Sequence, residues 1–87
     1  MTKEIQYSRH ARRRMSLYNI SEIDILSVIE HHNRKLDFSE GKHEIIGEMV
    51  FSQYGHPLKV VFSSEKAKII VITAYPLKRG SKNENSL

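Results

Sequence analysis

The chain has 87 residues and no cysteine, and its formal net charge at pH 7 is +4. This length suits one domain with a single small core, and the absence of cysteine excludes disulfide bonds, zinc–cysteine sites and thiol catalysis. The N-terminus has no apolar signal-peptide core, and the longest apolar run, IIVITA, is too short to cross a membrane. We therefore expect a cytoplasmic protein with no membrane partner.

The basic residues are concentrated near the two ends of the sequence. Lys3 and four arginines lie in the first fifteen residues, and Lys78, Arg79 and Lys82 lie in the last ten. Most of the acidic residues lie between these two groups. Such an uneven distribution favours an anionic partner, which is RNA, DNA or an acidic protein.

Residues 3–18 predict a strand followed by a helix. KEIQY, residues 3–7, has the pattern of a short strand, and Ser8 can cap a helix that runs to about Tyr18. The helix would direct Ala11, Met15 and Tyr18 toward a core.

A second helix is predicted from Ser21 to about Asn33. Ser21 is its N-cap, and Asp24, three residues later, gives an acidic variant of the capping box. Its predicted apolar side consists of Ile23, Leu26 and Ile29, with Ile25 and Val28 alongside.

The pattern then changes from helical to strand-like. The predicted elements are an edge strand at 34–40, a strand at 42–53 with Gly47 as a bulge or close-approach point, a turn at 54–57, a strand at 58–64 and a last strand at 68–75. The last strand is apolar on both faces and should be central. The predicted fold class is α+β, with two N-terminal helices packed on a small antiparallel sheet in the order β-α-α-β-β-β, with a further strand if 34–40 is counted. One domain is expected at 1–77, followed by a flexible polar tail at 78–87.

Three segments, SRHARRRM, ISEIDILSVIE and GHPLKVVFSSEKAKIIVITAYP, resemble an uncharacterised prokaryotic domain family. Its pattern is Ser-x-His-Ala-x-x-Arg-Met, then Ile-Ser, then a closing hairpin that ends in Thr-x-Tyr, and the resemblance spans Tyr7 to Pro76. That family is similar to the RelE/ParE toxins, whose fold places two N-terminal helices against a small antiparallel sheet. The resemblance implies a toxin-like or nuclease-like fold, often encoded beside an antitoxin. It implies no particular activity, because the ParE branch acts without cleaving RNA.

His10 and Arg14 are the strongest candidates for catalysis. They are four residues apart, so a helix places them on one face. Metal-independent RNA cleavage needs a base, an acid and cations around the phosphate; histidine suits the proton transfers and arginine suits the phosphate. The structural alternative is a half-buried His10 bonded to backbone or a carboxylate, with Arg14 bridging to an acid on the sheet.

Lys59 and Tyr75 are the candidates from the strands. Lys59 alternates with Leu58, Val60 and Phe62, so it should point away from that apolar row. The resemblance implies a role for Tyr75, because a tyrosine or histidine near the C-terminus of RelE-like nucleases often takes part in catalysis, and Thr73 lies two residues earlier on the same face. The alternative for Tyr75 is an aromatic residue at the rim of the core with its hydroxyl in water.

Arg9, Arg12 and Arg13 are candidates for nucleic-acid binding. They are spread around the predicted helix, so we do not expect all three to reach one ligand; a solvated helix face explains them equally well. No metal or other cofactor is predicted. His31 and His32 are adjacent and diverge on a helix, while His43 and His56 stand alone.

Two classes of function remain open from the residues. One is a toxin-like metal-independent endoribonuclease, of the mRNA interferase type, with His10, Arg14, Lys59 and Tyr75 around one cleft. The other is a non-catalytic module that binds nucleic acid or protein, which includes a toxin that acts by binding. The expected partners are RNA and either a cognate antitoxin or a second copy added at a free sheet edge, formed by 34–38 or by the first strand.

Overall fold

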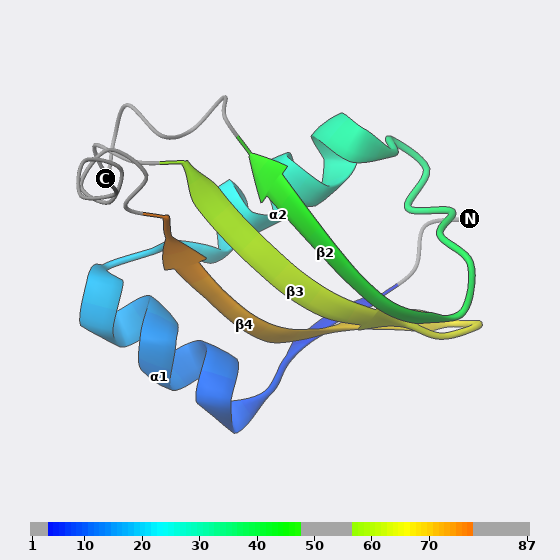
Figure 1. Ribbon diagram of the computed structural model, residues 1–87. Coiled ribbons are helices and arrows are strands. Elements are labelled where there is room, and N and C mark those ends of the chain that lie inside the picture. Colours follow the sequence, from blue (N-terminus) through cyan, green and yellow to red (C-terminus); the bar gives the residue numbers. More distant parts are fainter. Residues whose placement is uncertain (1–3, 48–56, 78–87) are drawn as a thin grey trace, which may run out of the picture.

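The structure is a computed structural model, and it describes residues 4–47 and 57–77. The element order is β-α-α-β-β-β, which confirms the predicted α+β class. The elements are β1 (Glu4–Tyr7), α1 (Arg9–Tyr18), α2 (Glu22–His32), β2 (Gly41–Gly47), β3 (Leu58–Ser64) and β4 (Lys68–Pro76) (Figure 1). The predicted tail, the predicted turn residues 54–56 and the second half of the strand predicted at 42–53 lie outside the described residues.

The four strands form one sheet in the order β1-β4-β3-β2. The β2–β3 and β3–β4 pairs are antiparallel, whereas β1 pairs with β4 in parallel, so the sheet is mixed and not wholly antiparallel as expected. The chain reaches β4 from β1 through two helices and two other strands, and such a long connection permits a parallel pair. β4 is central, as its apolar character on both faces predicts. β1 and β2 lie at the two edges, so the first strand is an edge as expected and residues 34–38 are not.

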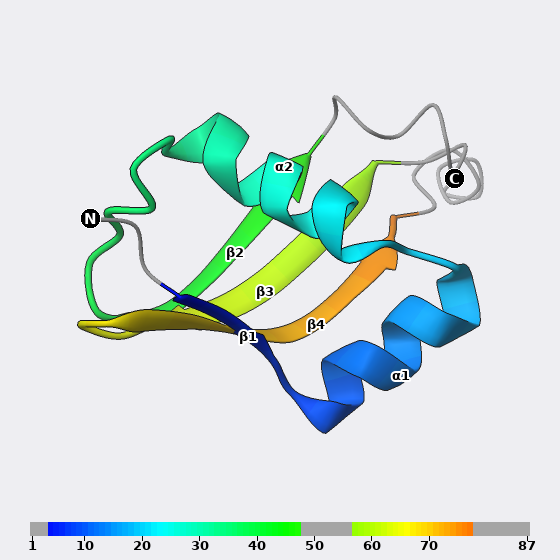
Figure 2. The same ribbon diagram turned by 180° about the vertical axis from the view of Figure 1, so that it is seen from behind.

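The two helices occupy different positions on the sheet. α2 lies across one face, over β2 and β3, and α1 lies beside the C-terminal half of β4, beyond the end of β1 (Figures 1 and 2). Both helices begin where the sequence predicts, because the hydroxyls of Ser8 and Ser21 accept backbone N–H groups of the first turn. α1 ends at Asn19, whose left-handed backbone (φ 58°) closes the last turn.

The core lies between the sheet and α2 and extends to α1. It contains Ala11 and Met15 of α1, which confirms the predicted stripe, and Phe62 is its largest fully buried side chain. The α2 prediction is wrong in one respect, because Ile23 is 74% exposed. The buried residues of α2 are Ile25, Val28 and Ile29, and Ile23 lies on the opposite side of the helix from them.

The predicted edge strand at 34–40 is also wrong. Asn33 forms a turn there: its Oδ1 accepts the backbone N–H of Lys35 at 3.1 Å, and its Nδ2 donates to the carbonyl of Asp37 at 2.9 Å. Leu36 then takes a left-handed backbone (φ 58°) and is completely buried. Side-chain hydrogen bonds to the local backbone have replaced strand pairing in this segment.

Gly47 lies where β2 meets α2, which makes it the close-approach point that the sequence predicts. A Cβ at this position would overlap both Cγ atoms of Val28, a fully buried residue of α2.

We expect Gly47→Ala to destabilise the fold by about 1–3 kcal/mol, because the added methyl must displace α2 or Val28. Chemical denaturation of the single and double variants measures this effect. In a Val28→Ala background the cost of Gly47→Ala should shrink, since the overlapping methyl groups are gone. Strictly additive costs would contradict a direct contact between the two residues.

Tyr7 is a partly buried residue at the end of β1, and the Arg12 guanidinium lies 5.1 Å from the centre of its ring. Burial raises the pKa of the Tyr7 hydroxyl, and the nearby Glu22 carboxylate raises it further against the opposing effect of Arg12. The hydroxyl therefore stays protonated to a higher pH in the folded chain than in the unfolded chain.

This pKa difference predicts a loss of stability in alkali. The stability that the protonated Tyr7 contributes is complete below the unfolded pKa of about 10 and is lost as the pH rises through the folded pKa. Melting temperatures measured from pH 8 to 11 should fall less steeply for Tyr7→Phe than for the wild type. Tyr18→Phe serves as the control for loss of a tyrosine hydroxyl, and parallel curves for Tyr7→Phe and wild type would contradict the prediction.

Candidate functional site

The face of the sheet that points away from α2 carries the predicted strand candidates. We call this face the open face, and strand register assigns to it Lys42, Glu44, Ile46, Lys59, Val61, Ser63, Ile70, Thr73 and Tyr75. It faces the viewer in Figure 1, where neither helix crosses it. Leu58, Val60 and Phe62 lie on the other face within the core, so the prediction that Lys59 points away from them is confirmed.

A row of side chains crosses the open face toward α1. Ile46 pairs with Lys59, and Lys59 pairs with Tyr75, so these three residues lie side by side on adjacent strands. Arg14 of α1 continues the row, since its guanidinium carbon is 5.9 Å from the centre of the Tyr75 ring. This is the distance of a cation–π contact. Three of the four predicted catalytic residues therefore meet at one place.

Lys59 is held by an acidic residue that the sequence analysis did not select. Its Nζ lies 3.0 Å from Oε1 of Glu44, which is the neighbour of Lys59 diagonally across β2 and β3. This hydrogen bond raises the pKa of Lys59, and the negative charge of an ionised Tyr75 would raise it further. The same hydrogen bond lowers the pKa of Glu44. At neutral pH the pair is thus an ammonium and a carboxylate, so neither group is suited to donating or accepting a proton near pH 7.

His10 lies one helical turn before Arg14, on the same flank of α1, and its side chain is exposed. Across residues 4–47 and 57–77, the structure gives its ring no hydrogen bond, ion pair or ring contact. The alternative prediction, which gave His10 and Arg14 purely structural roles, is therefore wrong for both residues. His10 is not half-buried, and Arg14 stacks on Tyr75 rather than bridging to an acid of the described sheet.

Thr73 adjoins the row on β4. It pairs with Val61 and lies two residues before Tyr75 on the same face, as the sequence predicts. Its Oγ1 is buried and has no hydrogen-bond partner among the described residues. Tyr75 itself is partly exposed at the rim of the sheet.

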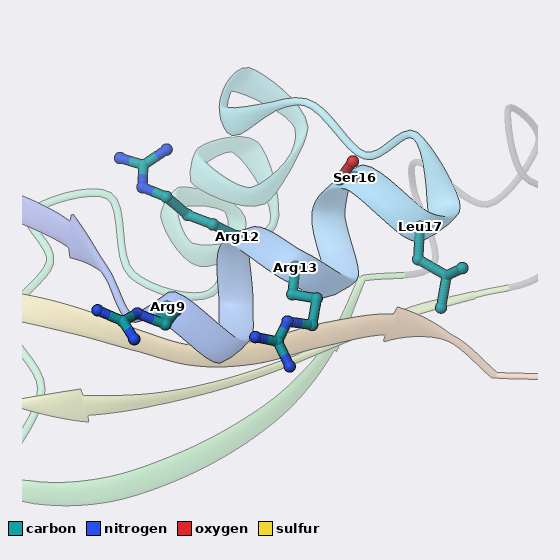
Figure 3. Close-up of a pocket in the computed structure, with 5 residues that line it drawn as sticks. All are labelled: Arg9, Arg12, Arg13, Ser16 and Leu17. Carbon is teal, nitrogen blue, oxygen red and sulfur yellow. The ribbon is translucent and has the colours of Figure 1, made fainter.

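The other arginines of α1 divide into one bound residue and two free ones. Arg12 donates to Oε2 of Glu22 at 3.0 Å and covers the Tyr7 ring, so it joins α1 to α2 and β1. Arg9 and Arg13 have no ion pair within the described part of the chain. All three arginines line an open depression with Ser16 and Leu17, and Figure 3 shows that the Arg12 and Arg13 side chains extend in opposite directions.

Two of the remaining histidines serve the fold. A ring nitrogen of His32 lies 3.2 Å from the carbonyl of Ile46, and His43 stacks on Phe62 while its Nε2 lies 2.7 Å from the carbonyl of Ser39. No three metal-ligating side chains gather within the part of the chain that the structure describes. Neither described helix is long and apolar enough to span a membrane.

The fold and the row of side chains define a class of protein: a small α+β domain whose open sheet face presents a lysine and a tyrosine, with an arginine of a basic helix against the tyrosine. Residues 7–76 match the family described as a domain of unknown function, DUF4258, and the chain belongs to that family. No curated protein and no solved structure matches the chain.

Because Arg12 is paired and Arg13 is not, we expect removal of their charges to affect the free energy of unfolding differently. Arg12→Met should lower the free energy of unfolding by about 0.5–1 kcal/mol, because it removes an exposed ion pair and a cation–π contact but keeps the apolar stem. Arg13→Met should stay within about 0.5 kcal/mol of the wild type. Urea denaturation measures both variants, and equal losses would mean that the contacts of Arg12 do not stabilise the fold.

Proposed function

We propose that the open face and the adjoining flank of α1 form the site of a toxin-like, metal-independent endoribonuclease. The observation that carries this proposal is the meeting of Arg14, Lys59 and Tyr75, which come from three different elements. Two cations beside a tyrosine hydroxyl suit a phosphodiester, because the transition state of its cleavage carries extra negative charge on the phosphate oxygens. The sequence resemblance to the RelE/ParE toxins fits RNA cleavage and action without cleavage alike, so the proposal rests on the geometry of the row.

The reaction divides the work among four side chains. The 2′-oxygen of a ribose attacks the neighbouring phosphorus, the bond to the 5′-oxygen breaks, and the products are a 2′,3′-cyclic phosphate and a free 5′-hydroxyl. Arg14 and Lys59 stabilise the phosphate oxygens. His10 takes the 2′-hydroxyl proton, and Tyr75 gives a proton to the leaving 5′-oxygen. Lys59 serves as a cation in this scheme because its raised pKa keeps it charged.

The free arginines of α1 support an anionic substrate. Arg9 and Arg13 lie on the outer side of the helix whose flank carries His10 and Arg14. A nucleic-acid strand bound along the row would extend toward them and gain salt-sensitive contacts. A cognate antitoxin, or a second copy of the chain, is the protein partner that we propose for the edge of β1 or β2.

The alternative function is a module that binds nucleic acid or protein without cleavage. One observation favours it: His10 has no described contact that would hold its ring toward Tyr75. Binding needs only the cationic row and the outer arginines, so it does not depend on the orientation of His10.

Cleavage of a labelled single-stranded RNA in the presence of a chelator tests the enzymatic proposal. We expect His10→Ala and Tyr75→Phe each to reduce the rate by about 100- to 10,000-fold, as for loss of a general base or acid. Lys59→Met and Arg14→Met should each reduce it by about 10- to 100-fold, as for loss of one charge-assisted hydrogen bond. A 2′-deoxy substitution at the cleaved nucleotide should block the reaction.

Matched variants separate these roles from general effects. Tyr18→Phe, Lys66→Met and Arg34→Met remove the same groups from positions outside the proposed site, and melting curves confirm that each variant is folded. The enzymatic proposal would be rejected if the wild type does not cleave the RNA, or if cleavage survives each of the four substitutions at His10, Arg14, Lys59 and Tyr75. In that case salt-sensitive RNA binding that falls with Arg9→Met or Arg13→Met would support the alternative.

A further inference from the structure

The ion pair between Lys59 and Glu44 lies within the proposed phosphate-binding row. Lys59 lies in the row between Ile46 and Tyr75. The Glu44 carboxylate reaches it from the neighbouring strand at 3.0 Å, and the side chains of Lys59 and Glu44 are 24% and 50% exposed. Both groups are therefore within reach of a ligand on the open face.

A carboxylate on this lysine has the same chemistry as the ligand proposed for it. Carboxylate and phosphate oxygens are both charged acceptors that an ammonium binds at about 2.7–2.9 Å. A phosphate that approaches Lys59 must either displace Glu44 or bind within a few ångströms of its negative charge. Each course weakens binding, the first by breaking an existing pair and the second by repulsion between like charges.

Resting on the proposed function, we infer that Glu44 takes the place of a substrate phosphate on Lys59 in the free protein. Glu44 is thus a specificity-determining residue. Its carboxylate competes with any phosphate for Lys59, so only a ligand with further contacts displaces it. A lone phosphate gains too little from Lys59 to displace it. An RNA strand also contacts Arg14, Tyr75 and the outer arginines, and these added contacts drive the exchange.

The inference predicts that removal of the Glu44 charge strengthens binding. The probe is a short single-stranded RNA with 2′-O-methyl groups, which cannot be cleaved, and its affinity is measured by fluorescence anisotropy at several salt concentrations. Glu44→Gln should bind the probe about fivefold or more tightly than the wild type, because a like charge within a few ångströms of the phosphate is gone. Glu44→Ala should behave in the same way, and melting curves verify the fold of both.

Glu65→Gln is the matched control, since it removes the same charge from an exposed position in the β3–β4 turn, at the other end of β3 from Lys59. It should change the affinity by less than about twofold, because salt screens exposed charges beyond about 10 Å.

The salt dependence separates displacement of Glu44 from a general change of charge. In the wild type, Lys59 exchanges one anion for another, so its contact releases no counterion. In Glu44→Gln, Lys59 gains a phosphate without losing a carboxylate. The slope of log K against log salt should therefore steepen by about 0.7 in Glu44→Gln and remain unchanged in Glu65→Gln.

The outcomes distinguish this inference from the proposed function. If the wild type binds the probe and Lys59→Met weakens binding, but Glu44→Gln matches Glu65→Gln or binds more weakly than the wild type, the inference is overturned and the proposed site stands. If neither the wild type nor Glu44→Gln binds the probe, the open face is not a phosphate site and both proposals fail.

Discussion

The hydroxyl of Ser8 holds the arrangement on which the site depends. It accepts the backbone N–H of Ala11 at 3.0 Å, which caps α1, and it donates to the carbonyl of Ile72 at 2.9 Å, which ties that cap to β4. Ile72 lies at a β-bulge, the irregularity in the pairing of β4 with Val61 and Phe62. One side chain therefore positions the start of α1 against β4, and Arg14 meets Tyr75 farther along the same two elements.

This anchor gives a physical meaning to the Ser-x-His-Ala-x-x-Arg-Met pattern. Ser8 caps and anchors the helix, Ala11 is completely buried, and Met15 packs in the core. His10 and Arg14 are the two remaining residues of the pattern, and neither belongs to that core. The pattern thus combines three positions that build the fold with two that the fold leaves at the edge of the open face.

The parts of the structure that were predictable from the sequence are those fixed by local interactions. Serine caps and alternating apolar residues locate α1, α2, β3 and β4. The segment 34–40 was mispredicted, because its apolar residues suggest a strand whereas the Asn33 side chain closes a turn. Glu44 was missed for a different reason: it reaches Lys59 only through the register of β2 on β3, and periodicity along one strand contains no information about pairing with another.

The charges of the molecule divide into two sets with different physical roles. In the row, Lys59 is balanced by Glu44, so this lysine exerts little attraction at a distance, whereas Arg14 of α1 lies against the neutral Tyr75 ring and keeps its charge. On the outer side of α1, Arg9 and Arg13 have no described counter-charge and extend into solvent.

These two sets of charges act over different distances. An unbalanced exposed charge acts over a Debye length of about 10 Å, whereas a balanced pair acts only on a group that contacts it. In the proposed function, the helix is therefore the element that would attract an anionic chain, and the sheet is the element that would discriminate among anions already in contact. Because the cap at Ser8 holds one element against the other, a ligand attracted by the helix would arrive next to the row on the sheet.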